Sequence, residues 1–142
     1  MIGIIVCGHG RFASGISSAL ELIAGKQADF VAVDFDGRGD VKALLQQAVN
    51  SLACEQILFF TDILGGAPFR NASLIAQERG QCEVVAGLTA QMLIEACLER
   101  DDYEDLTASV VELIENTRMG VTSLSLQLAG KKPAASNSDG GI

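Results

Sequence analysis

One short run constrains this chain more than any other, because it is an apolar stretch that ends in the only histidine of the sequence: Ile4-Ile5-Val6-Cys7-Gly8-His9-Gly10. Four consecutive apolar residues, three of them β-branched, are typical of a strand buried on both faces of a parallel sheet. Glycine on each side of His9 lets the backbone turn sharply and lets a ligand approach closely. The imidazole is therefore predicted at the carboxyl end of a central strand, where open α/β sheets bind their ligands.

Short apolar runs and helical spacing alternate along the rest of the chain. The runs at residues 30–35, 57–60 and 84–86 predict further strands, and helical spacing predicts helices over about residues 16–23, 41–52, 68–80, 89–99 and 106–117. Asp40 is placed to cap the second of these helices. Strands and helices that alternate four times predict an α/β fold, in which a doubly wound, mainly parallel sheet of four strands carries helices on both faces.

The pattern changes after the last of these helices. Leu124, Leu126 and Leu128 alternate with polar residues, which predicts a half-buried, antiparallel edge strand over residues 121–128. Residues 131–142 have few apolar side chains to bury and are predicted to form a disordered tail. Since 142 residues are the size of one ordinary domain, the chain is interpreted as a single domain, residues 1–130, followed by this tail.

Charge and composition exclude several classes of function. The formal net charge of -8 argues against binding nucleic acid or an anionic membrane and favours a partner with a basic face. The four cysteines form no C-x-x-C pair and are interpreted as reduced thiols. The chain starts without the basic region of a signal peptide, and no apolar run reaches membrane-spanning length. We therefore expect a cytoplasmic protein that is not inserted into the membrane.

Two predicted strand ends carry groups that could act together. His9 ends the first strand, and Asp62 follows the third strand, just before Gly65-Gly66-Ala67-Pro68. If these strands are neighbours at the switch point of the sheet, the Asp62 carboxylate can accept a hydrogen bond from one imidazole nitrogen and leave the other as a nucleophile. Backbone groups at Gly10, Gly65, Gly66 and Ala67 are candidates for binding a phosphate, because the last three lie at a helix N-terminus. The pattern favours phosphoryl transfer through a phosphohistidine.

Each of these residues also has a purely structural interpretation. A lone histidine after a strand can be a turn residue, Asp62 can brace the following loop, and Gly65-Gly66 can form a tight turn. Arg11 and Arg70 could contact a phosphate but are interpreted as solvated surface residues, and Asp34 is interpreted as a structural one. One histidine and unclustered cysteines give no metal-ligand spacing, and no P-loop motif is present, so neither metal nor cofactor is predicted. A histidine phosphatase would need a second active-site histidine.

The sequence resembles the enzyme IIA component of the mannose-family sugar phosphotransferase system. The resemblance covers about residues 1–128 and rests on Gly8-His9-Gly10, Val33-Asp34-Phe35 and Thr61-Asp62-Ile63-Leu64-Gly65-Gly66-Ala67-Pro68-Phe69. Within the family, residues 8–15 and Pro68-Phe69-Arg70 are most similar to the N-acetylgalactosamine or galactosamine branch.

The resemblance implies a place in a relay. His9 would accept a phosphoryl group from the phosphocarrier protein HPr and pass it to a IIB component, with Asp62 as the carboxylate that orients the histidine. It also implies a homodimer in which residues 121–128 pair with the sheet of the partner chain. Because only a short tail follows the domain, IIB is expected on a separate polypeptide. The alternative is a non-catalytic regulatory module of the same fold that senses phosphorylation.

Ala67 departs from the family pattern, in which a hydroxyl residue is usual before the proline. Alanine is a poor N-cap, at a cost of about 1 kcal/mol relative to serine or threonine. Because the backbone amide remains, we expect phosphate binding there to survive in weakened form.

Overall fold

Four parallel strands form one sheet in the order β2-β1-β3-β4. The computed structural model describes residues 1–130. The strands are β1 (Ile2–His9), β2 (Phe30–Phe35), β3 (Gln56–Thr61) and β4 (Cys82–Val85). The helices are α1 (Phe12–Ala24), α2 (Val41–Ser51), α3 (Ala67–Arg79), α4 (Ala90–Glu99), α5 (Leu106–Met119) and α6 (Leu124–Gly130), with a short 3-10 helix η1 (Arg100–Asp102) after α4. The predicted doubly wound α/β sheet is confirmed.

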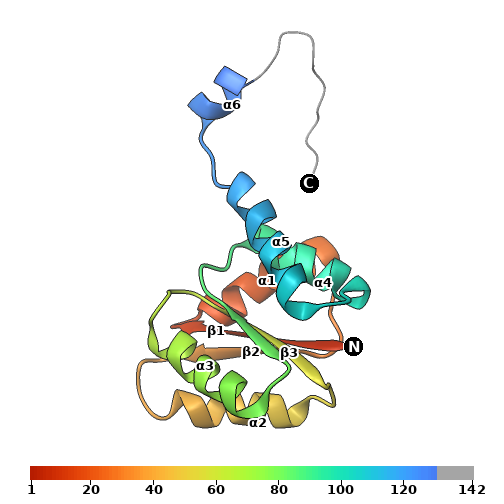
Figure 1. Ribbon diagram of the computed structural model, residues 1–142. Helices are drawn as coiled ribbons and strands as arrows, with labels where there is room; N and C mark the ends of the chain where they lie inside the picture. The colour runs from red at the N-terminus through yellow and green to blue at the C-terminus, as the bar shows by residue number, and fades with distance from the viewer. Residues whose placement is uncertain (131–142) are drawn as a thin grey trace.

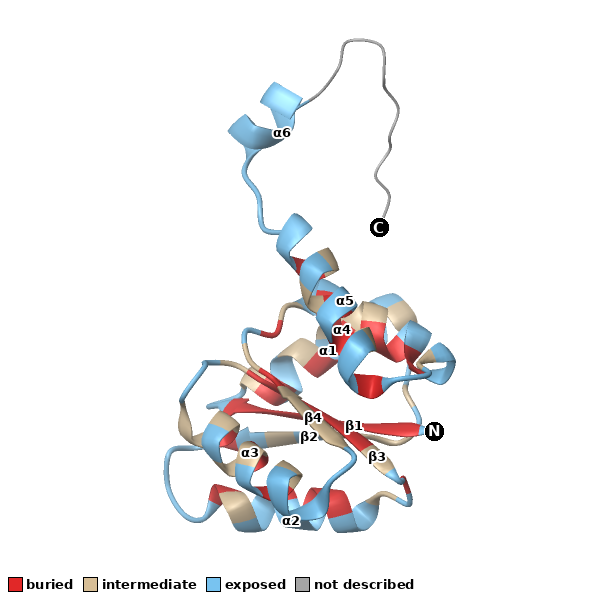
Figure 2. Ribbon diagram, in the orientation of Figure 1, coloured by how far each residue is buried: buried red, intermediate tan, exposed pale blue. Residues whose placement is uncertain are grey.

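Helices cover both faces of the sheet, as Figure 1 shows. Side chains that alternate along β1 enter two separate cores: Val6 packs with α1 and α4 on one face, while Ile5 packs with α2 and α3 on the other. Residues 2–8 of β1 are all buried, which is why this strand appears uniformly buried in Figure 2. The unbroken apolar run of the sequence is thus explained by a strand with no solvent-facing side until it reaches His9.

The strand order fixes where a site can lie. From β1 the chain moves to β2 on one side, and then crosses to β3 on the other side of β1. The direction of winding therefore reverses between β1 and β3, and the carboxyl ends of these two strands flank the crevice in which such sheets bind ligands. The predicted cap on α2 is also confirmed, because the Asp40 carboxylate accepts a hydrogen bond from the N–H of Ala43 at 3.1 Å.

Residues 121–128 do not form the predicted edge strand. They hold an irregular segment and most of α6, which stands away from the body of the molecule with every residue exposed (Figures 1 and 2). A strand needs a neighbouring strand for its backbone groups, whereas a helix satisfies them locally, as the 3.0 Å bond from Gln127 N–H to the Ser123 carbonyl does. Leucines two residues apart share one face of a strand but not of a helix. The predicted disordered tail, residues 131–142, lies outside the described residues.

Within residues 1–130, no helix combines the length and the apolar character needed to cross a lipid bilayer.

Candidate active site

His9 lies at the end of the central strand, directly beside the end of β3. The last pair of the β1–β3 ladder joins Cys7 to Thr61, so His9 and Asp62 follow at adjacent strand ends. The side chain of His9 is 45% exposed, although seven residues before it are buried. Its ring is tilted by 56° against the ring of Phe35, with 6.1 Å between the ring centroids. The buried strand thus ends in a side chain that solvent and a partner protein can reach.

The Asp62 carboxylate holds both the backbone and the ring of His9. Its Oδ2 atom lies 2.8 Å from the backbone nitrogen of His9 and 2.8 Å from the ring atom Nδ1. The predicted hydrogen bond between the two side chains is therefore confirmed. An ionised carboxylate can only accept, so Nδ1 carries the proton in this bond. Among residues 1–130, Nε2 has no hydrogen-bond partner, which leaves its lone pair available.

Asp62 itself is fixed from several directions. Its Oδ1 atom accepts a hydrogen bond from the N–H of Ile63 at 2.8 Å, and its main-chain carbonyl accepts one from Gly87 at 3.0 Å. The preceding residue, Thr61, donates its buried hydroxyl to the carbonyl of Val85 at 3.0 Å. These contacts tie the end of β3 to the segment after β4, so the carboxylate has little freedom to leave His9.

Hydrogen bonds keep the Asp62 carboxylate ionised. Burial of its side chain, which is only 9% exposed, by itself raises the pKa of the carboxyl. The hydrogen bonds from the backbone and side chain of His9 and from Ile63 N–H outweigh that effect, and the pKa of Asp62 is lowered below its ordinary value. The carboxylate is therefore charged at neutral pH, as stabilisation of a protonated or phosphorylated imidazole requires.

Helix α3 begins beside the imidazole. Its N-cap is Gly66, whose carbonyl accepts the first helical hydrogen bond, from Arg70 N–H at 2.9 Å. Gly66 lies so close to His9 that a Cβ atom at this position would be 3.1 Å from the ring atom Cε1. Gly65, in front of it, has φ of +80°, a conformation that favours glycine. The positive end of the α3 dipole therefore lies next to the ring.

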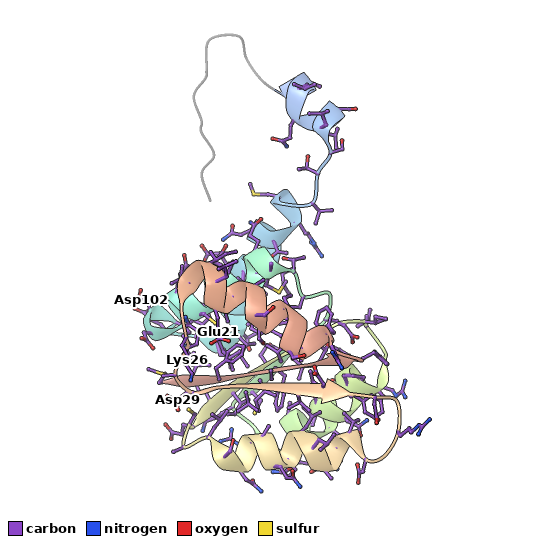
Figure 3. The ribbon with its side chains drawn as sticks, turned by 180° about the vertical axis from the view of Figure 1, so that it is seen from behind. Glu21, Lys26, Asp29 and Asp102 are labelled. Atoms are coloured by element: carbon purple, nitrogen blue, oxygen red, sulfur yellow. The ribbon has the colours of Figure 1, made fainter. Side chains whose placement is uncertain are left out.

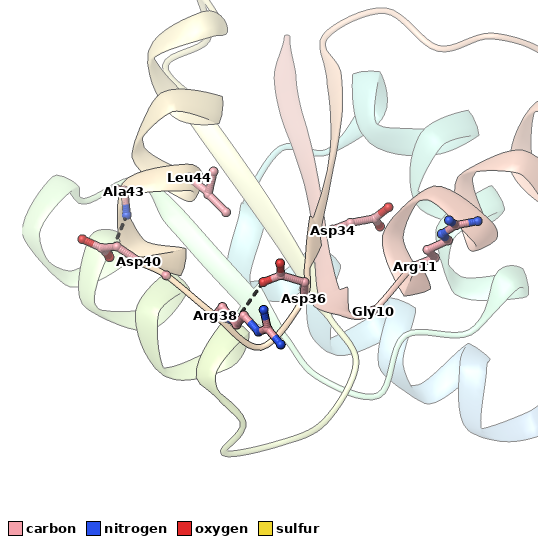
Figure 4. A pocket seen from close by; sticks show the side chains of 9 residues that line it. Gly10, Arg11, Asp34, Asp36, Arg38, Asp40, Ala43 and Leu44 are labelled. Carbon is pink, nitrogen blue, oxygen red and sulfur yellow. Dashed lines mark hydrogen bonds between the residues drawn. The ribbon is translucent and has the colours of Figure 1, made fainter.

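A hollow of about 760 Å³ lies beside Gly10, the residue after His9, and His9 is not among the residues that line it. Figure 4 shows Arg11 and Arg38 on opposite sides of it, with Asp34 and Asp36 between them. Charges of both signs meet here. Within residues 1–130, no group of three or more His, Cys, Asp and Glu side chains is placed to hold a metal ion.

The acidic surface expected from the net charge lies elsewhere. Eight of the 18 acidic residues of the chain fall within residues 95–115, on α4, η1, α5 and the segment that joins η1 to α5. In Figure 3, Asp102 lies with Glu21, Lys26 and Asp29 at the end of the molecule where β1 begins, opposite the edge that carries His9. The whole-chain charge therefore does not describe the surface that a partner would meet around His9.

Comparison with known proteins supports one family. A family model described as "EIIA-man: PTS system fructose IIA component" matches residues 3–115, which include the whole site. The chain belongs to the mannose-family IIA components of the sugar phosphotransferase system.

Three relatives place the chain within this IIA family. The mannose-specific EIIAB component of Escherichia coli strain K12 is 30% identical over 141 residues, which cover 94% of this chain but 44% of that protein. The chain thus spans less than half the length of this relative. The fructose-specific EIIA component of Bacillus subtilis is 29% identical over 105 residues, covering 71% of this chain and 72% of that one. The crystal structure of phosphotransferase system component EIIA from Streptococcus agalactiae has 38% identity and a TM-score of 0.82, covering 89% and 99% of the two chains. None of these three descriptions names galactosamine, so that branch stays a prediction.

Two of the four predicted phosphate-binding amides in this IIA chain are already used. The N–H of Gly10 donates to the carbonyl of Phe35 at 2.6 Å, and the N–H of Gly66 donates to the carbonyl of Ile63 at 3.1 Å. Among the described residues, the amides of Gly65 and Ala67 have no such backbone acceptor. These two remain the candidates for binding an anion.

The prediction that Ala67 occupies the cap position of α3 is wrong. Helix α3 begins one residue earlier, so Gly66 is the N-cap and Ala67 is the first helical residue, followed by Pro68. Glycine is a tolerable N-cap, whereas alanine is a poor one, so the expected cost of a missing hydroxyl cap does not arise. The amide of Ala67 is one of the free donors of the first helical turn.

Sequence reasoning missed two arrangements. Arg11 is the N-cap of α1, but its side chain makes no capping hydrogen bond. Asp34 from β2 caps the helix instead, by accepting hydrogen bonds from the N–H and the hydroxyl of Ser14 at 2.9 and 2.6 Å. The structural interpretation of Asp34 is thereby supported. Arg70 donates to the carbonyl of Gly65 and so braces the loop before α3, a role that its interpretation as a solvated residue did not include. Both contacts join distant or loop segments, and no local pattern indicates them.

Proposed function

We propose that His9 is the phosphoryl-accepting nucleophile of this IIA component. In this proposal Nε2 accepts the phosphoryl group from phospho-HPr and passes it to a IIB component. The supporting observation is the 2.8 Å contact between Nδ1 and Asp62 Oδ2, because it places the proton on Nδ1 and the free lone pair on Nε2. The exposure of the ring at the end of a buried strand gives a donor protein access to that lone pair.

The transfer step balances without a cofactor. The Nε2 lone pair attacks the phosphorus of the donor phosphohistidine, the new N–P bond forms as the donor N–P bond breaks, and the donor ring keeps that electron pair. Nδ1 retains its proton throughout, so the phosphorylated ring carries positive charge that the Asp62 carboxylate offsets. The reverse sequence of bond changes delivers the group to IIB. Little covalent chemistry is required of the protein, and its work is alignment and electrostatic stabilisation.

The loop before α3 is proposed to receive the oxygens of the phosphoryl group. The amides of Gly65 and Ala67 are available donors, and the positive end of the α3 dipole lies beside them. Pro68 has no N–H, so a phosphoryl group at this helix end meets fewer donors than a helix without proline would offer. The brace from Arg70 to the Gly65 carbonyl supports the loop in this position.

Mass spectrometry tests the proposal. The chain is incubated with phosphoenolpyruvate, enzyme I and HPr, and compared with His9→Ala. We expect the native chain to gain the mass of one acid-labile phosphoryl group, to lose it when a IIB protein is added, and His9→Ala to gain nothing. Label that forms but never passes to IIB would favour the phosphorylation-sensing regulatory module instead. A native chain that gains no label, with HPr shown to be phosphorylated in the same tube, would refute the proposal.

We further propose that the chain forms a homodimer through residues 121–128. β4 is an edge strand, and a hollow of about 500 Å³ beside it is lined largely by apolar side chains, including Phe69, Val84 and Val121. The leucines of α6 are 61–74% exposed, which is costly for a segment that stays alone in water. In a second copy the same residues would find at β4 the strand partner that they lack here.

Light scattering coupled to gel filtration tests this association. We expect twice the monomer mass for the native chain and the monomer mass for a chain that ends at residue 120. Leu124→Asp with Leu126→Asp, which keeps the full length, serves as the matched variant and should also be a monomer. A native chain that elutes as a monomer at micromolar concentration would contradict the proposal.

A further inference from the structure

The backbone conformation of Gly66 does not require glycine at this position. Its φ of -70° and ψ of 168° are accessible to any residue, unlike the φ of +80° at Gly65. It is the N-cap of α3, a position at which serine, asparagine or aspartate stabilise a helix at least as well as glycine. Its amide is already bonded to Ile63, so the residue offers no free donor either. Neither helix capping nor backbone strain therefore explains the absence of a side chain.

The imidazole of His9 does explain it. A Cβ atom added at Gly66 would lie 3.1 Å from Cε1 of His9, 3.3 Å from the carbonyl oxygen of Ile63 and 3.8 Å from Cδ of Pro68. Carbon atoms in contact normally lie about 3.5–4.0 Å apart. The carbonyl belongs to the backbone that caps this turn, so the ring is the group that would have to move.

The direction of that movement matters because of where Cε1 lies in the ring. It is bonded to both nitrogens, of which Nδ1 is held at 2.8 Å from Asp62 Oδ2 while Nε2 has no hydrogen-bond partner among residues 1–130. Pressure on Cε1 therefore displaces both nitrogens together. A displacement of even a few tenths of an ångström disturbs the geometry of the bond to Asp62 and moves the Nε2 lone pair from its line of attack.

We infer that Gly66 is a positioning residue, whose missing side chain makes the space that keeps the His9 ring bonded to Asp62 and Nε2 aligned for transfer. This inference rests on the proposed function of His9. It assigns Gly66 a steric role, distinct from that of the neighbouring amides of Gly65 and Ala67. It also predicts that a better helix cap at this position gives a worse phosphoryl acceptor.

Two substitutions separate the steric role from helix stability. Gly66→Ala adds a Cβ and is a poor cap, whereas Gly66→Ser adds a Cβ and is a good cap. Gly15→Ala is the control, because a Cβ at that exposed helical position meets nothing within 4 Å. We expect Gly66→Ser to unfold at a higher temperature than Gly66→Ala, because serine is the better cap and both variants disturb the same contact between the ring and Asp62. Both should accept phosphate more slowly to a similar extent, so the slower transfer cannot come from a weakened helix.

The first readout is nitrogen NMR of the imidazole in the unphosphorylated chain. His9 is the only histidine, so one pair of ring-nitrogen signals reports on the site without assignment by mutation. We expect the native chain and Gly15→Ala to show the tautomer with its proton on Nδ1. In Gly66→Ser and Gly66→Ala this preference should weaken, with a larger share of the Nε2-protonated tautomer, because the bond to Asp62 that maintains it is weakened.

The second readout is the rate of phosphoryl acceptance from phospho-HPr. We expect both Gly66 variants to be slower by about tenfold to a hundredfold, the range that a misplaced reacting group produces. Gly66→Ser with the native tautomer, with the native rate, or with a change in one and not the other would overturn the inference. The proposed function fails on a different result, namely absence of label on the native chain, whatever the NMR of the variants shows.

Discussion

Substitution of Asp62 with asparagine tests the site most directly, because one carboxylate accepts three hydrogen bonds that an amide cannot all accept. Oδ2 accepts from the backbone and the ring of His9, and Oδ1 accepts from Ile63 N–H. In Asp62→Asn one of these two positions becomes an NH2 group that faces an N–H donor. If the nitrogen replaces Oδ2, the imidazole can bond to it only through an unprotonated Nδ1, and the proton moves to Nε2. If it replaces Oδ1, the bonds to His9 survive without the charge that strengthened them.

The expected magnitude follows from these bonds. A hydrogen bond to a charged group contributes about 1.5–3 kcal/mol, against roughly 1 kcal/mol for a neutral one, and a buried mismatch costs about 1–3 kcal/mol. At about 1.4 kcal/mol per factor of ten, loss of the charged bond to the ring slows phosphoryl acceptance by about tenfold to a hundredfold. The same substitution lowers the free energy of unfolding by about 1–3 kcal/mol, because the mismatch lies in a largely buried position.

The pH dependence of stability has a definite sign. The pKa of Asp62 is lower in the folded chain than in the unfolded chain, so the unfolded chain binds the proton more readily. The stabilisation is fully present above the ordinary carboxyl pKa of about 4 and is lost as pH falls through the lower, folded-state pKa. The native chain should therefore lose stability more steeply below pH 4 than Asp62→Asn, which has no carboxyl group at this position.

The assays are rapid-quench phosphorylation by phospho-HPr, denaturant unfolding at several pH values, and nitrogen NMR of His9. Asp34→Asn is the matched control, because Asp34 is also at a strand end and also accepts two hydrogen bonds, but from Ser14 rather than His9. It should lose stability while it keeps the native tautomer and rate. Asp62→Asn that accepts phosphate at the native rate would refute the reasoning.

Three further predictions concern other parts of the chain. Arg100→Met should lower the free energy of unfolding, measured in urea, by about 2–4 kcal/mol without changing the rate of phosphorylation. The reason is that the buried Arg100 guanidinium donates to three backbone carbonyls at the end of the sheet remote from His9. Arg118→Met, at an exposed position, is the control. Burial raises the pKa of Cys7 to about 12, so iodoacetamide at pH 8 should modify the partly exposed Cys82 and leave Cys7 unmodified in a peptide map of the folded chain. Ala67→Ser should leave the unfolding temperature nearly unchanged, since the residue is not the N-cap; a clear rise would contradict that placement.

The sequence predicts the sheet and the pairing of His9 with Asp62 because both follow from local patterns plus one topological rule. Each strand is an apolar run bounded by turn residues, and the chain can wind such units in few ways. Once β3 is next to β1, the residues that follow them lie at one switch point. No knowledge of side-chain contacts is needed to bring the two side chains together.

What the sequence does not predict depends on contacts between distant segments. The N–H of Gly10 is taken by the carbonyl of Phe35 only because β2 ends opposite β1, and Asp34 caps α1 for the same reason. From the sequence, Arg100 is expected to be a surface charge at the end of a helix. In the structure it is 4% exposed and donates hydrogen bonds to the carbonyls of Ile2 and Ala28, far earlier in the chain. In residues 121–128 the alternating leucines indicate an apolar face but not the surface against which it would pack. Without such a surface, residues 124–130 form a helix in the single chain.

Asp62 serves both the fold and the chemistry of the site, so substitutions of this residue affect stability and phosphoryl transfer together. Asp62 satisfies a backbone amide at the end of the central strand and orients the nucleophile through the same oxygen atom. Any substitution there must therefore change stability and transfer together, and a slow variant cannot by itself separate the two causes. A Cβ added at Gly66 would press on the His9 ring, and the Asp62 carboxylate keeps its bond to the His9 backbone in Gly66→Ser, so this variant should slow transfer with a smaller loss of stability than Asp62→Asn. If the two substitutions slow transfer equally although Asp62→Asn loses more stability, the placement of the imidazole, and not the strength of the surrounding structure, limits phosphoryl transfer.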